Sequence, residues 1–498
     1  MIAAHHTPPR NATQDPLLCR RRWPLHAAGS LILCRRMDLR LSGPATAIAR
    51  AIRERQVSSE EVVRACVERV SAVNLRLNAV VQLPAEAALA QAREADRALA
   101  RGEIRGPLHG VPFTLKDAIE TAGVISTGGT LGRACYVPAE DAPVVKQLRA
   151  AGSILLGKTN CPELGWAWES DNLIYGRTNN PYDLSLSPGG SSGGESAIIA
   201  AGGSAFGLGS DAGGSVRFPA HCTGITAIKP TSGRVPRTGH FPGPGGTLDS
   251  LWQIGPLARF VEDLILVLPV ISGVDWRDAA VIPMPLGDPR AVDVKSLRIS
   301  FHTDNGVVSP TRETAEVVRN AARALSEVCG AVEEVRLHGI EETYEIYLKL
   351  FSADGGAGLE ALLRTAGTTR VHPLMQRVLE IQRANRLSTA EFGSLVVRWD
   401  IFRSVMLSFM ESYDAILCPV CAFPGMVHGS TYDRLEAFSY TMTYNLTGWP
   451  AAVVRAGTSA EGLPIGVQIA ARPWREDVAL AVAQCIETVL GGYRPPQL

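Results

Sequence analysis

The feature that most constrains the fold is the alternation of helical segments with short apolar strands. The stretch SSEEVVRACVERVSAVN, residues 58–74, opens with serines and glutamates that suit an N-terminal cap, then repeats apolar residues at helical spacing. Residues 86–102 predict a second amphipathic helix that ends at a glycine. The apolar run 111–115 and the segment 152–160, GSILLGKTN, predict two strands. This alternation indicates an α/β sheet protein, although the pattern alone does not decide between one domain and two.

The N-terminal segment differs from the rest of the chain. Residues 20–36, RRRWPLHAAGSLILCRR, join a basic start to a short apolar run, as export signals do. Arginines close that run, and no small-residue cleavage site follows it. Met37 opens the first well-patterned segment. We therefore expect residues 1–36 to be a disordered or over-extended leader and residues 37–498 to form the folded part.

The charge and the cysteine content indicate which partners and which cellular location to expect for this protein. Lys+Arg and Asp+Glu are 49 each, so the net charge is zero and nucleic acid is not an expected partner. No stretch reaches the roughly 18 consecutive apolar residues that a membrane span needs. The ten cysteines show no framework spacing, which is typical of reduced thiols in a cytoplasmic protein. Cys418 and Cys421 form a CxxC pair with no second pair at zinc-finger spacing, so we interpret them as small apolar residues at a strand end.

A tract rich in glycine and serine, SPGGSSGGESAIIAAGG at residues 187–203, fits a phosphate cradle, a nucleophile turn or a flexible linker. A P-loop needs a lysine after its last glycine, and Glu195 stands there instead. A dinucleotide fingerprint needs a strand immediately before the tract, and none is predicted. Residues 190–194 spell G-x-S-x-G, a nucleophile elbow around Ser192 that also requires a downstream acid and histidine. The histidines available downstream have no distinguishing context: His240, His302, His338, His372 and His428.

A second tract, GLGSDAGGSVRFPA, begins at Gly207 and places flexible backbone just before a serine. Over residues 211–215, several successive N–H groups can converge on one point and form a nest for an anion. Such a nest suits an oxyanion hole, where fixed donors meet the negative charge that develops in acyl transfer. Ser215 would then be the nucleophile. A structural glycine turn fits the same residues.

A serine nucleophile needs a base, and Lys116 is the best candidate. It follows the apolar run 111–115, and burial of a lysine lowers its pKa, so that the neutral amine can accept a proton. The alternative is a surface lysine at a strand end. Pairing with the neighbouring Asp117 would in that case raise the pKa of the lysine.

These tracts belong to a larger set of segments: GVPFTLKD, GKTNCPE, NPYDLSLSPGGSSGGESAIIAAG, GSDAGGSVRFPA, GITAIKPTSGRVPRTG and GPLARFVEDL. In their order and approximate spacing they resemble the amidase signature family, and the resemblance extends over nearly everything from Met37 to the end of the chain. It implies one large α/β domain with a twisted mixed sheet of about ten or more strands covered by helices. It also implies an amide hydrolase that requires no metal and no organic cofactor.

For the site, the resemblance implies a Ser-cisSer-Lys triad. Ser215 falls on the nucleophile, Ser191 on the serine that relays protons and follows a cis peptide bond, and Lys116 on the base. The backbone N–H groups that fall on the family's oxyanion hole are those of Ala212, Gly213, Gly214 and Ser215.

Two charged residues flank that loop. We expect Asp211 and Arg217 to pair and to fix the loop from behind, the alternative being a plain surface salt bridge.

The substrate is less well defined, because the family contains amidotransferase glutaminases, fatty-acid amide hydrolases, aryl-acylamidases, peptide amidases and carbamate-cleaving enzymes. The glutaminases usually carry glutamine where Phe218 follows the arginine of the motif. This favours a free-standing hydrolase of small apolar or aromatic amides, with carbamates (urethanes) and esters as further candidates. A glutaminase subunit with partner chains and a non-catalytic binding protein are the alternatives.

Residues 340–412 diverge most from the family, are largely helical in pattern and are expected to form a lid and substrate entrance. The sequence leaves the choice between monomer and homodimer open. Three aromatic residues could line an acyl pocket, although each also suits the core: Tyr136, Trp166 and Trp168.

Overall fold

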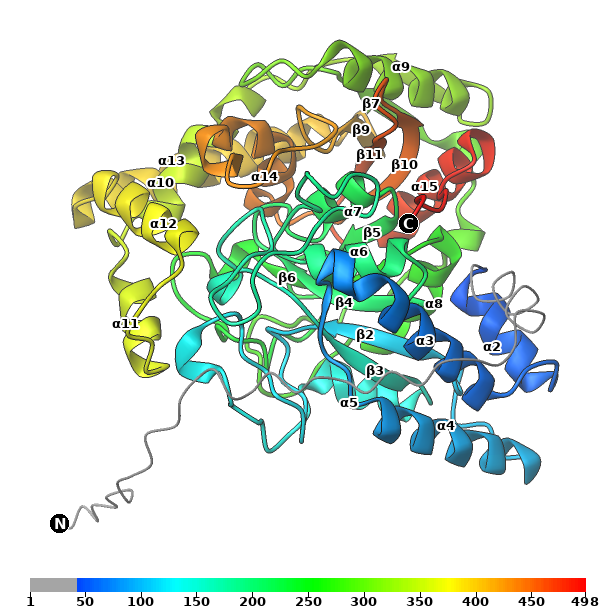
Figure 1. Ribbon diagram of the computed structural model, residues 1–498. Helices are drawn as coiled ribbons and strands as arrows, with labels where there is room; N and C mark the ends of the chain where they lie inside the picture. Colours follow the sequence, from blue (N-terminus) through cyan, green and yellow to red (C-terminus); the bar gives the residue numbers. More distant parts are fainter. Residues whose placement is uncertain (1–42) are drawn as a thin grey trace.

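One mixed sheet forms the centre of the structure, a computed structural model that describes residues 43–498. The sheet has 11 strands in the order β1-β3-β2-β4-β6-β5-β10-β11-β9-β7-β8, and helices pack around it (Figure 1). The predicted α/β class is confirmed, and the continuity of the sheet makes the described residues a single domain. The leader expected at residues 1–36 lies outside the described residues.

The strands pair in parallel in two places and antiparallel elsewhere. β2 runs parallel to β3 and β4, and β7 runs parallel to β8 and β9. Because Leu115 of β2 pairs with Leu208 of β4, the carboxyl ends of these two strands lie side by side at one edge of the sheet. The strands are β1 Val80–Gln82, β2 Pro112–Lys116, β3 Ile154–Thr159, β4 Phe206–Asp211, β5 Thr226–Lys229, β6 Gln253–Ala258, β7 Arg298–Phe301, β8 Ala331–Glu334, β9 Ala415–Pro419, β10 Ala451–Thr458 and β11 Pro464–Ala471.

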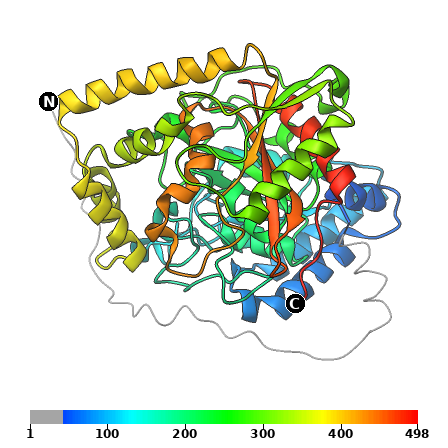
Figure 2. The same cartoon turned by 90° about the horizontal axis from the view of Figure 1, so that it is seen from above.

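The helices fall into those that cover the sheet and a group that packs mainly on itself. α15 packs on β10 and β11, and α8 packs on β5 and β6, whereas α10 contacts α12, α13 and α14. Figure 1 shows α10 to α13 at one side of the molecule, and Figure 2 shows the long α13 along the outer edge. The helices are α2 Ala45–Arg53, α3 Ser59–Leu77, α4 Ala85–Ala100, α5 Pro143–Ala150, α6 Gly193–Ala200, α7 Arg217–Thr223, α8 Val261–Ile271, α9 Arg312–Ser326, α10 Thr343–Ser352, α11 Ala357–Thr365, α12 Pro373–Ala384, α13 Thr389–Phe409, α14 Ser439–Leu446 and α15 Glu476–Leu490.

The helix predicted from residues 58–74 is α3, and it begins at the expected cap. The Ser58 hydroxyl accepts a hydrogen bond from the Glu61 N–H at 3.1 Å, and the Glu61 carboxylate accepts one from the Ser58 N–H at 2.7 Å. This reciprocal capping box satisfies two N–H groups that a helix start otherwise leaves unpaired. The helix continues past the quoted stretch to Leu77, and Asn78 ends it in the left-handed conformation at φ 50°.

The cysteines of the CxxC pair lie in the core. Cys418 belongs to β9 and Cys421 follows it, both are 0% exposed, and both are free thiols. Burial raises the pKa of the Cys418 thiol to about 11 and that of Cys421 to about 12. Their interpretation as small apolar residues at a strand end is therefore confirmed.

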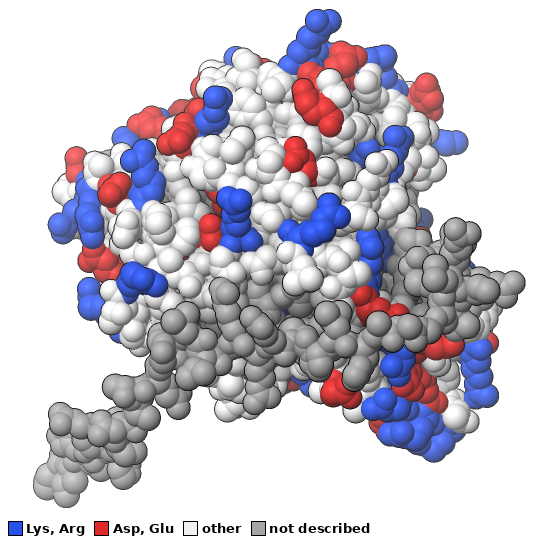
Figure 3. Space-filling model, in the orientation of Figure 1, with Lys and Arg blue, Asp and Glu red and all other residues white. Residues whose placement is uncertain are grey.

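The surface carries charges of both signs. On the face shown in Figure 3, basic and acidic residues of the described part of the chain are interspersed around a largely uncharged centre. Within residues 43–498, none of the helices combines the length and the apolar character that crossing a membrane takes.

The capping box gives a stability test. We expect Ser58→Ala to lower the free energy of unfolding by about 1 kcal/mol, because the Glu61 N–H loses its acceptor. Ser71→Ala is the matched control: Ser71 lies within the same helix, is exposed, and its hydroxyl contacts only the Val67 carbonyl of its own helix. Denaturant titration followed by circular dichroism measures both variants. Equal midpoints for the two would contradict the role of the cap.

Candidate active site

Lys116 is the last residue of β2, and its side chain is completely buried. Its Nζ lies 2.6 Å from Ser191 Oγ and 2.9 Å from Ser210 Oγ. Burial lowers the pKa of Lys116 to about 8, against the opposing influence of Cys161, Asp211 and Glu195. The alternative of a surface lysine is therefore wrong, and the amine is held in contact with two hydroxyl groups.

Asp117 does not pair with this lysine. One of its carboxylate oxygens accepts hydrogen bonds from the Thr127 N–H at 3.0 Å and from the Thr127 hydroxyl. Burial raises the pKa of Asp117 to about 6, and the charge of Lys158 opposes that increase. The side chain that follows Lys116 thus belongs to a separate polar cluster.

Ser191 is brought to Lys116 by the turn that precedes α6. The peptide bond between Gly190 and Ser191 is cis, as the family resemblance implies. A Cβ atom at Gly190 would lie 2.3 Å from the Glu169 carbonyl oxygen, so this position has no room for a side chain. Ser192, the nucleophile of the elbow interpretation, is 0% exposed, and its Oγ lies 3.4 Å from both the N and the O of Ser210. Ser192 is therefore packed against β4.

Ser215 lies beside this turn although it comes from the second tract. Its carbonyl accepts a hydrogen bond from the Ser192 N–H at 3.1 Å, and the residue is 8% exposed. Ser191 is 2% exposed. The structure thus joins the two glycine-rich tracts at the carboxyl ends of β2 and β4, where Lys116 also lies.

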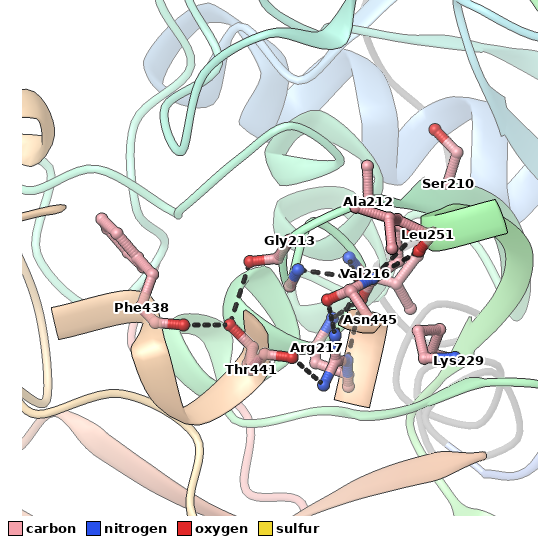
Figure 4. A network of polar contacts seen from close by, with 12 residues as sticks. Ser210, Ala212, Gly213, Val216, Arg217, Lys229, Leu251, Phe438, Thr441 and Asn445 are labelled. Carbon is pink, nitrogen blue, oxygen red and sulfur yellow. Dashed lines mark hydrogen bonds and ion pairs between the residues drawn. The ribbon is translucent and has the colours of Figure 1, made fainter. Parts of the chain in front are cut away.

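Asp211 and Arg217, which flank the loop that leads to Ser215, form a buried ion pair. Figure 4 shows Arg217 together with Thr441 and Asn445, which it also contacts. Arg217 Nη2 and Nε each lie 2.9 Å from a different oxygen of the Asp211 carboxylate, and both side chains are 0% exposed. The guanidinium also donates to Asn445 Oδ1 at 2.6 Å, to the Thr441 carbonyl at 3.0 Å and to Gln468 Oε1 at 2.5 Å. The surface salt bridge considered as an alternative is therefore wrong, and the expected pairing is found.

This pair fixes the charge of Asp211. Burial by itself raises the pKa of the Asp211 carboxyl, but the charge of Arg217 and hydrogen bonds from Arg217 and Asn445 outweigh it. The pKa consequently lies well below its usual range, and the group remains a carboxylate.

The carbonyl groups of the loop are held by donors from distant elements. The Tyr347 hydroxyl of α10 donates to the Ala212 carbonyl at 3.0 Å. The Trp168 Nε1–H and the Thr441 hydroxyl both donate to the Gly213 carbonyl at 2.9 Å. These bonds turn the carbonyl oxygens toward the protein and fix the peptide planes between them.

The N–H groups of the same loop are largely free. The Gly214 N–H donates to Asp211 Oδ1 at 2.8 Å, so of the four expected donors this one is already engaged. Within residues 43–498, the N–H groups of Ala212, Gly213 and Ser215 have no hydrogen-bond acceptor. Buried N–H groups seldom remain unpaired, so this loop can accept an anionic oxygen.

Two polar residues beside Lys116 were not predicted from the sequence. Ser210 Oγ contacts Lys116 Nζ on one side and His240 Nε2, at 2.8 Å, on the other. Ser210 directly precedes Asp211 in the second tract, so the strand that ends there could have indicated that it lies near the site. For His240 no such signal exists, because a bridge to Ile119 brings it to the site from a distant turn.

An aromatic cluster borders the loop that ends at Ser215. Trp168 stacks on Phe438 with ring centroids 4.7 Å apart, and Phe218 meets Phe438 edge-on at 4.9 Å. Trp166 and Phe351 of α10 approach to 4.8 Å. Of the three aromatic residues predicted as pocket or core residues, both tryptophans lie in this cluster.

Tyr136, the third of them, lies elsewhere. Its side chain is 41% exposed, and the Arg133 guanidinium lies 3.9 Å from its ring centroid.

Comparisons with known proteins agree with this arrangement. A family model described as Amidase matches residues 61–480. The chain belongs to the amidase signature family. A glutamyl-tRNA(Gln) amidotransferase chain of Moorella thermoacetica is 36% identical over 464 residues, which cover 88% of this chain and 94% of that protein. An acylamidase of Rhodococcus erythropolis is 33% identical over 472 residues, covering 89% and 95%. The structure of 6-aminohexanoate cyclic dimer hydrolase with its substrate superimposes with a TM-score of 0.81 at 30% identity, covering 92% of this chain and 99% of that one.

Membership in this family fits the observed sheet and identifies the chain as an amidase-type hydrolase that acts on carbon–nitrogen bonds. The relatives named above include both an acylamidase and an amidotransferase chain, so membership alone does not fix the substrate.

The buried ion pair yields a second stability prediction. We expect Arg217→Met to lower the free energy of unfolding by about 3–5 kcal/mol, because it leaves the Asp211 carboxylate buried without its counter-ion. Arg323→Met is the control: it removes an ion pair with Glu316 in which the arginine side chain is 70% exposed, and such pairs contribute about 0–1 kcal/mol. Thermal unfolding of both variants measures the difference. Similar losses for the two would contradict a special role for the buried pair.

Proposed function

We propose that this amidase is a serine hydrolase of small apolar or aromatic amides, with carbamates (urethanes) and esters as further substrates. The observation that carries the proposal is the contact of 2.6 Å between the buried Lys116 amine and the Ser191 hydroxyl, beside the loop that ends at Ser215. A neutral amine in contact with a hydroxyl can withdraw its proton, and that hydroxyl can in turn accept a proton from a neighbouring serine.

The first half of the proposed reaction forms an acyl-enzyme. Ser215 Oγ attacks the substrate carbonyl carbon while its proton passes to Ser191 Oγ and the proton of Ser191 passes to Lys116 Nζ. The carbonyl oxygen becomes an oxyanion. The free N–H groups of Ala212, Gly213 and Ser215 then donate to it, in a loop whose peptide planes are already fixed.

The second half releases the products. The C–N bond breaks as the Lys116 ammonium returns a proton through Ser191 to the leaving nitrogen. Water then attacks the ester at Ser215, gives its proton to the same relay, and Ser215 leaves with a proton from Ser191. The products are the free amine and the carboxylic acid, and the relay is back in its starting state.

The aromatic cluster supports an apolar acyl group. Phe218 is fully buried and packs against Phe438, at the position where glutaminase chains of the family usually carry glutamine. Trp168 connects the cluster to the loop, because its ring stacks on Phe438 and its Nε1–H donates to the Gly213 carbonyl. Burying an apolar substrate group beside these rings would favour binding by about 25 cal/mol for each Å² of apolar surface removed from water.

The helices between residues 340 and 412 are proposed to form the lid and entrance of this site. α10 supplies both Tyr347, which contacts the loop, and Phe351, which contacts Trp166. The free thiols of Cys418 and Cys421 support a cytoplasmic location. The proposed chemistry is the same in a monomer and in a homodimer.

The glutaminase alternative rests on the similarity to the amidotransferase chain of Moorella thermoacetica. A panel of a 4-nitroanilide, a carbamate, an ester and glutamine separates the two functions. We expect turnover of the anilide by the chain alone and little turnover of glutamine, because the rings of Trp168, Phe218 and Phe438 offer no counter-charge to the α-amino and α-carboxylate groups of glutamine. Turnover of glutamine without cleavage of the anilide would reverse this assignment.

The nucleophile can be identified by substitution and labelling. We expect Ser215→Ala to reduce kcat for the 4-nitroanilide by roughly a thousandfold or more and to abolish labelling by a fluorophosphonate. Ser192→Ala is the matched control, since its hydroxyl is buried against Ser210 and contacts neither Lys116 nor Ser191. Mass spectrometry of the labelled peptide identifies the modified residue. Labelling at Ser192 would contradict the proposed mechanism.

The pKa of the proposed base, Lys116, predicts how kcat/KM depends on pH. Lys116 accepts a proton only when its amine is neutral, and burial lowers its pKa to about 8. We therefore expect kcat/KM to rise tenfold per pH unit well below pH 8 and to level off above it. A pH–rate profile with the anilide measures this limb. A profile that is flat between pH 6 and 9 is the outcome that excludes Lys116 as the base.

A further inference from the structure

A line of polar contacts leads from the proposed base through Ser210 to a histidine, His240. Lys116 Nζ lies 2.9 Å from Ser210 Oγ, which lies 2.8 Å from His240 Nε2. The other ring nitrogen, His240 Nδ1, lies 2.9 Å from the Pro242 carbonyl oxygen. Both side chains are buried, with Ser210 6% exposed and His240 8% exposed. The reaction proposed above uses neither of them.

The Pro242 carbonyl determines the tautomer of His240. A carbonyl oxygen only accepts hydrogen bonds, so Nδ1 carries the proton. The neutral ring then presents a lone pair at Nε2, and the Ser210 hydroxyl must donate to it. Burial, the largest influence, and the charges of Lys116, Arg237 and Lys158 lower the pKa of His240 to about 3. The ring is therefore neutral over the working pH range.

Other side chains around the ring keep this arrangement in place. The ring lies 4.8 Å from that of Trp252, and the Arg237 guanidinium lies 4.9 Å from the same tryptophan. Arg237 is in turn paired with Asp278 and Asp249. Both acidic groups are thus paired with Arg237, and positive charge on Lys116 or Lys158 disfavours protonation of the imidazole.

The tautomer has a consequence for the base. A serine hydroxyl has one proton, and that of Ser210 is used on His240. Ser210 can therefore only accept from Lys116 and cannot donate to its lone pair. One N–H of the neutral amine points to Ser210, and the lone pair remains for Ser191 at 2.6 Å.

We propose that His240 is a positioning residue for this hydrolase: by accepting the Ser210 proton, it prevents Ser210 from competing with Ser191 for the lone pair of Lys116. The inference rests on the proposed function, because it concerns the proton relay of that site. Without His240, the Ser210 hydroxyl is free to rotate and to donate to the amine, which then cannot take the proton of Ser191.

The test compares two replacements of the ring. His240→Phe keeps an aromatic side chain against Trp252 but has no acceptor, whereas His240→Gln offers a carbonyl oxygen to Ser210 and an N–H to Pro242. We expect H240F to lower kcat for the 4-nitroanilide by about tenfold, the effect of one misdirected hydrogen bond, with KM within about twofold. H240Q is expected to stay within about threefold of the wild-type enzyme. H240L replaces H240F if the latter melts more than a few degrees below the wild-type protein.

A double variant separates positioning from packing. Ser210→Ala removes the competing hydroxyl, so adding H240F to it should cost no further activity. Additive losses in S210A/H240F, or equal losses in H240F and H240Q, would overturn the proposal, and so would full activity of H240F.

Fluorophosphonate labelling keeps this proposal distinct from the proposed function. Wild-type protein that hydrolyses the anilide but is not labelled at Ser215 would refute the mechanism, whatever the His240 variants do. Wild-type protein labelled at Ser215, together with an unchanged labelling rate in H240F, would refute only the role of His240.

Discussion

The site depends on one buried carboxylate. Asp211 ends β4, and its two oxygens accept hydrogen bonds from the Arg217 side chain, from Asn445 and from the Gly214 and Val216 N–H groups of the loop that follows. It therefore acts as an internal anion around which the loop folds. Such a charge is stable inside the protein only because Arg217 neutralises it, and Arg217 begins α7, the helix that follows the loop. Strand, loop and helix are thus tied together at one point.

Lys116 is also buried, but unlike Arg217 it has no carboxylate partner among the described residues. The acidic groups that influence its pKa do not form an ion pair with it, and the side chains within hydrogen-bond distance of its amine are the hydroxyls of Ser191 and Ser210. Burying an ammonium group without a counter-ion is costly, so the pKa of Lys116 falls to about 8 and the amine gives up its proton more easily than an exposed lysine does. The surroundings of the two basic residues of the site therefore have opposite effects on their charges. Arg217 keeps its charge through a carboxylate partner and supports the loop, whereas Lys116 loses its charge readily and remains able to take up a proton.

The sequence predicted the parts of the site that depend on local chain chemistry. The strand that ends at Lys116, the capped helix after Ser58 and the loop from Asp211 to Ser215 follow from periodicity, caps and glycines, which act over a few residues. The family resemblance added Ser191, which the G-x-S-x-G pattern alone would have passed over for Ser192. What could not be predicted depends on contacts between distant segments. His240 and Tyr347 reach the site through tertiary packing, and neither carries a local pattern that marks it.

Tyr347 shows why such distant contacts matter for specificity. It belongs to α10, inside the segment proposed as the lid, yet its hydroxyl holds the Ala212 carbonyl of the loop. A Cβ at Gly213 would lie 2.4 Å from that hydroxyl oxygen, so helix and loop are in direct contact. The same helix presents Phe351 to Trp166 in the aromatic cluster. A change of helix position that accommodates a different substrate would therefore also shift the peptide planes of the loop. In the proposed mechanism, substrate entry and the geometry of the N–H donors are therefore linked through a single helix, α10.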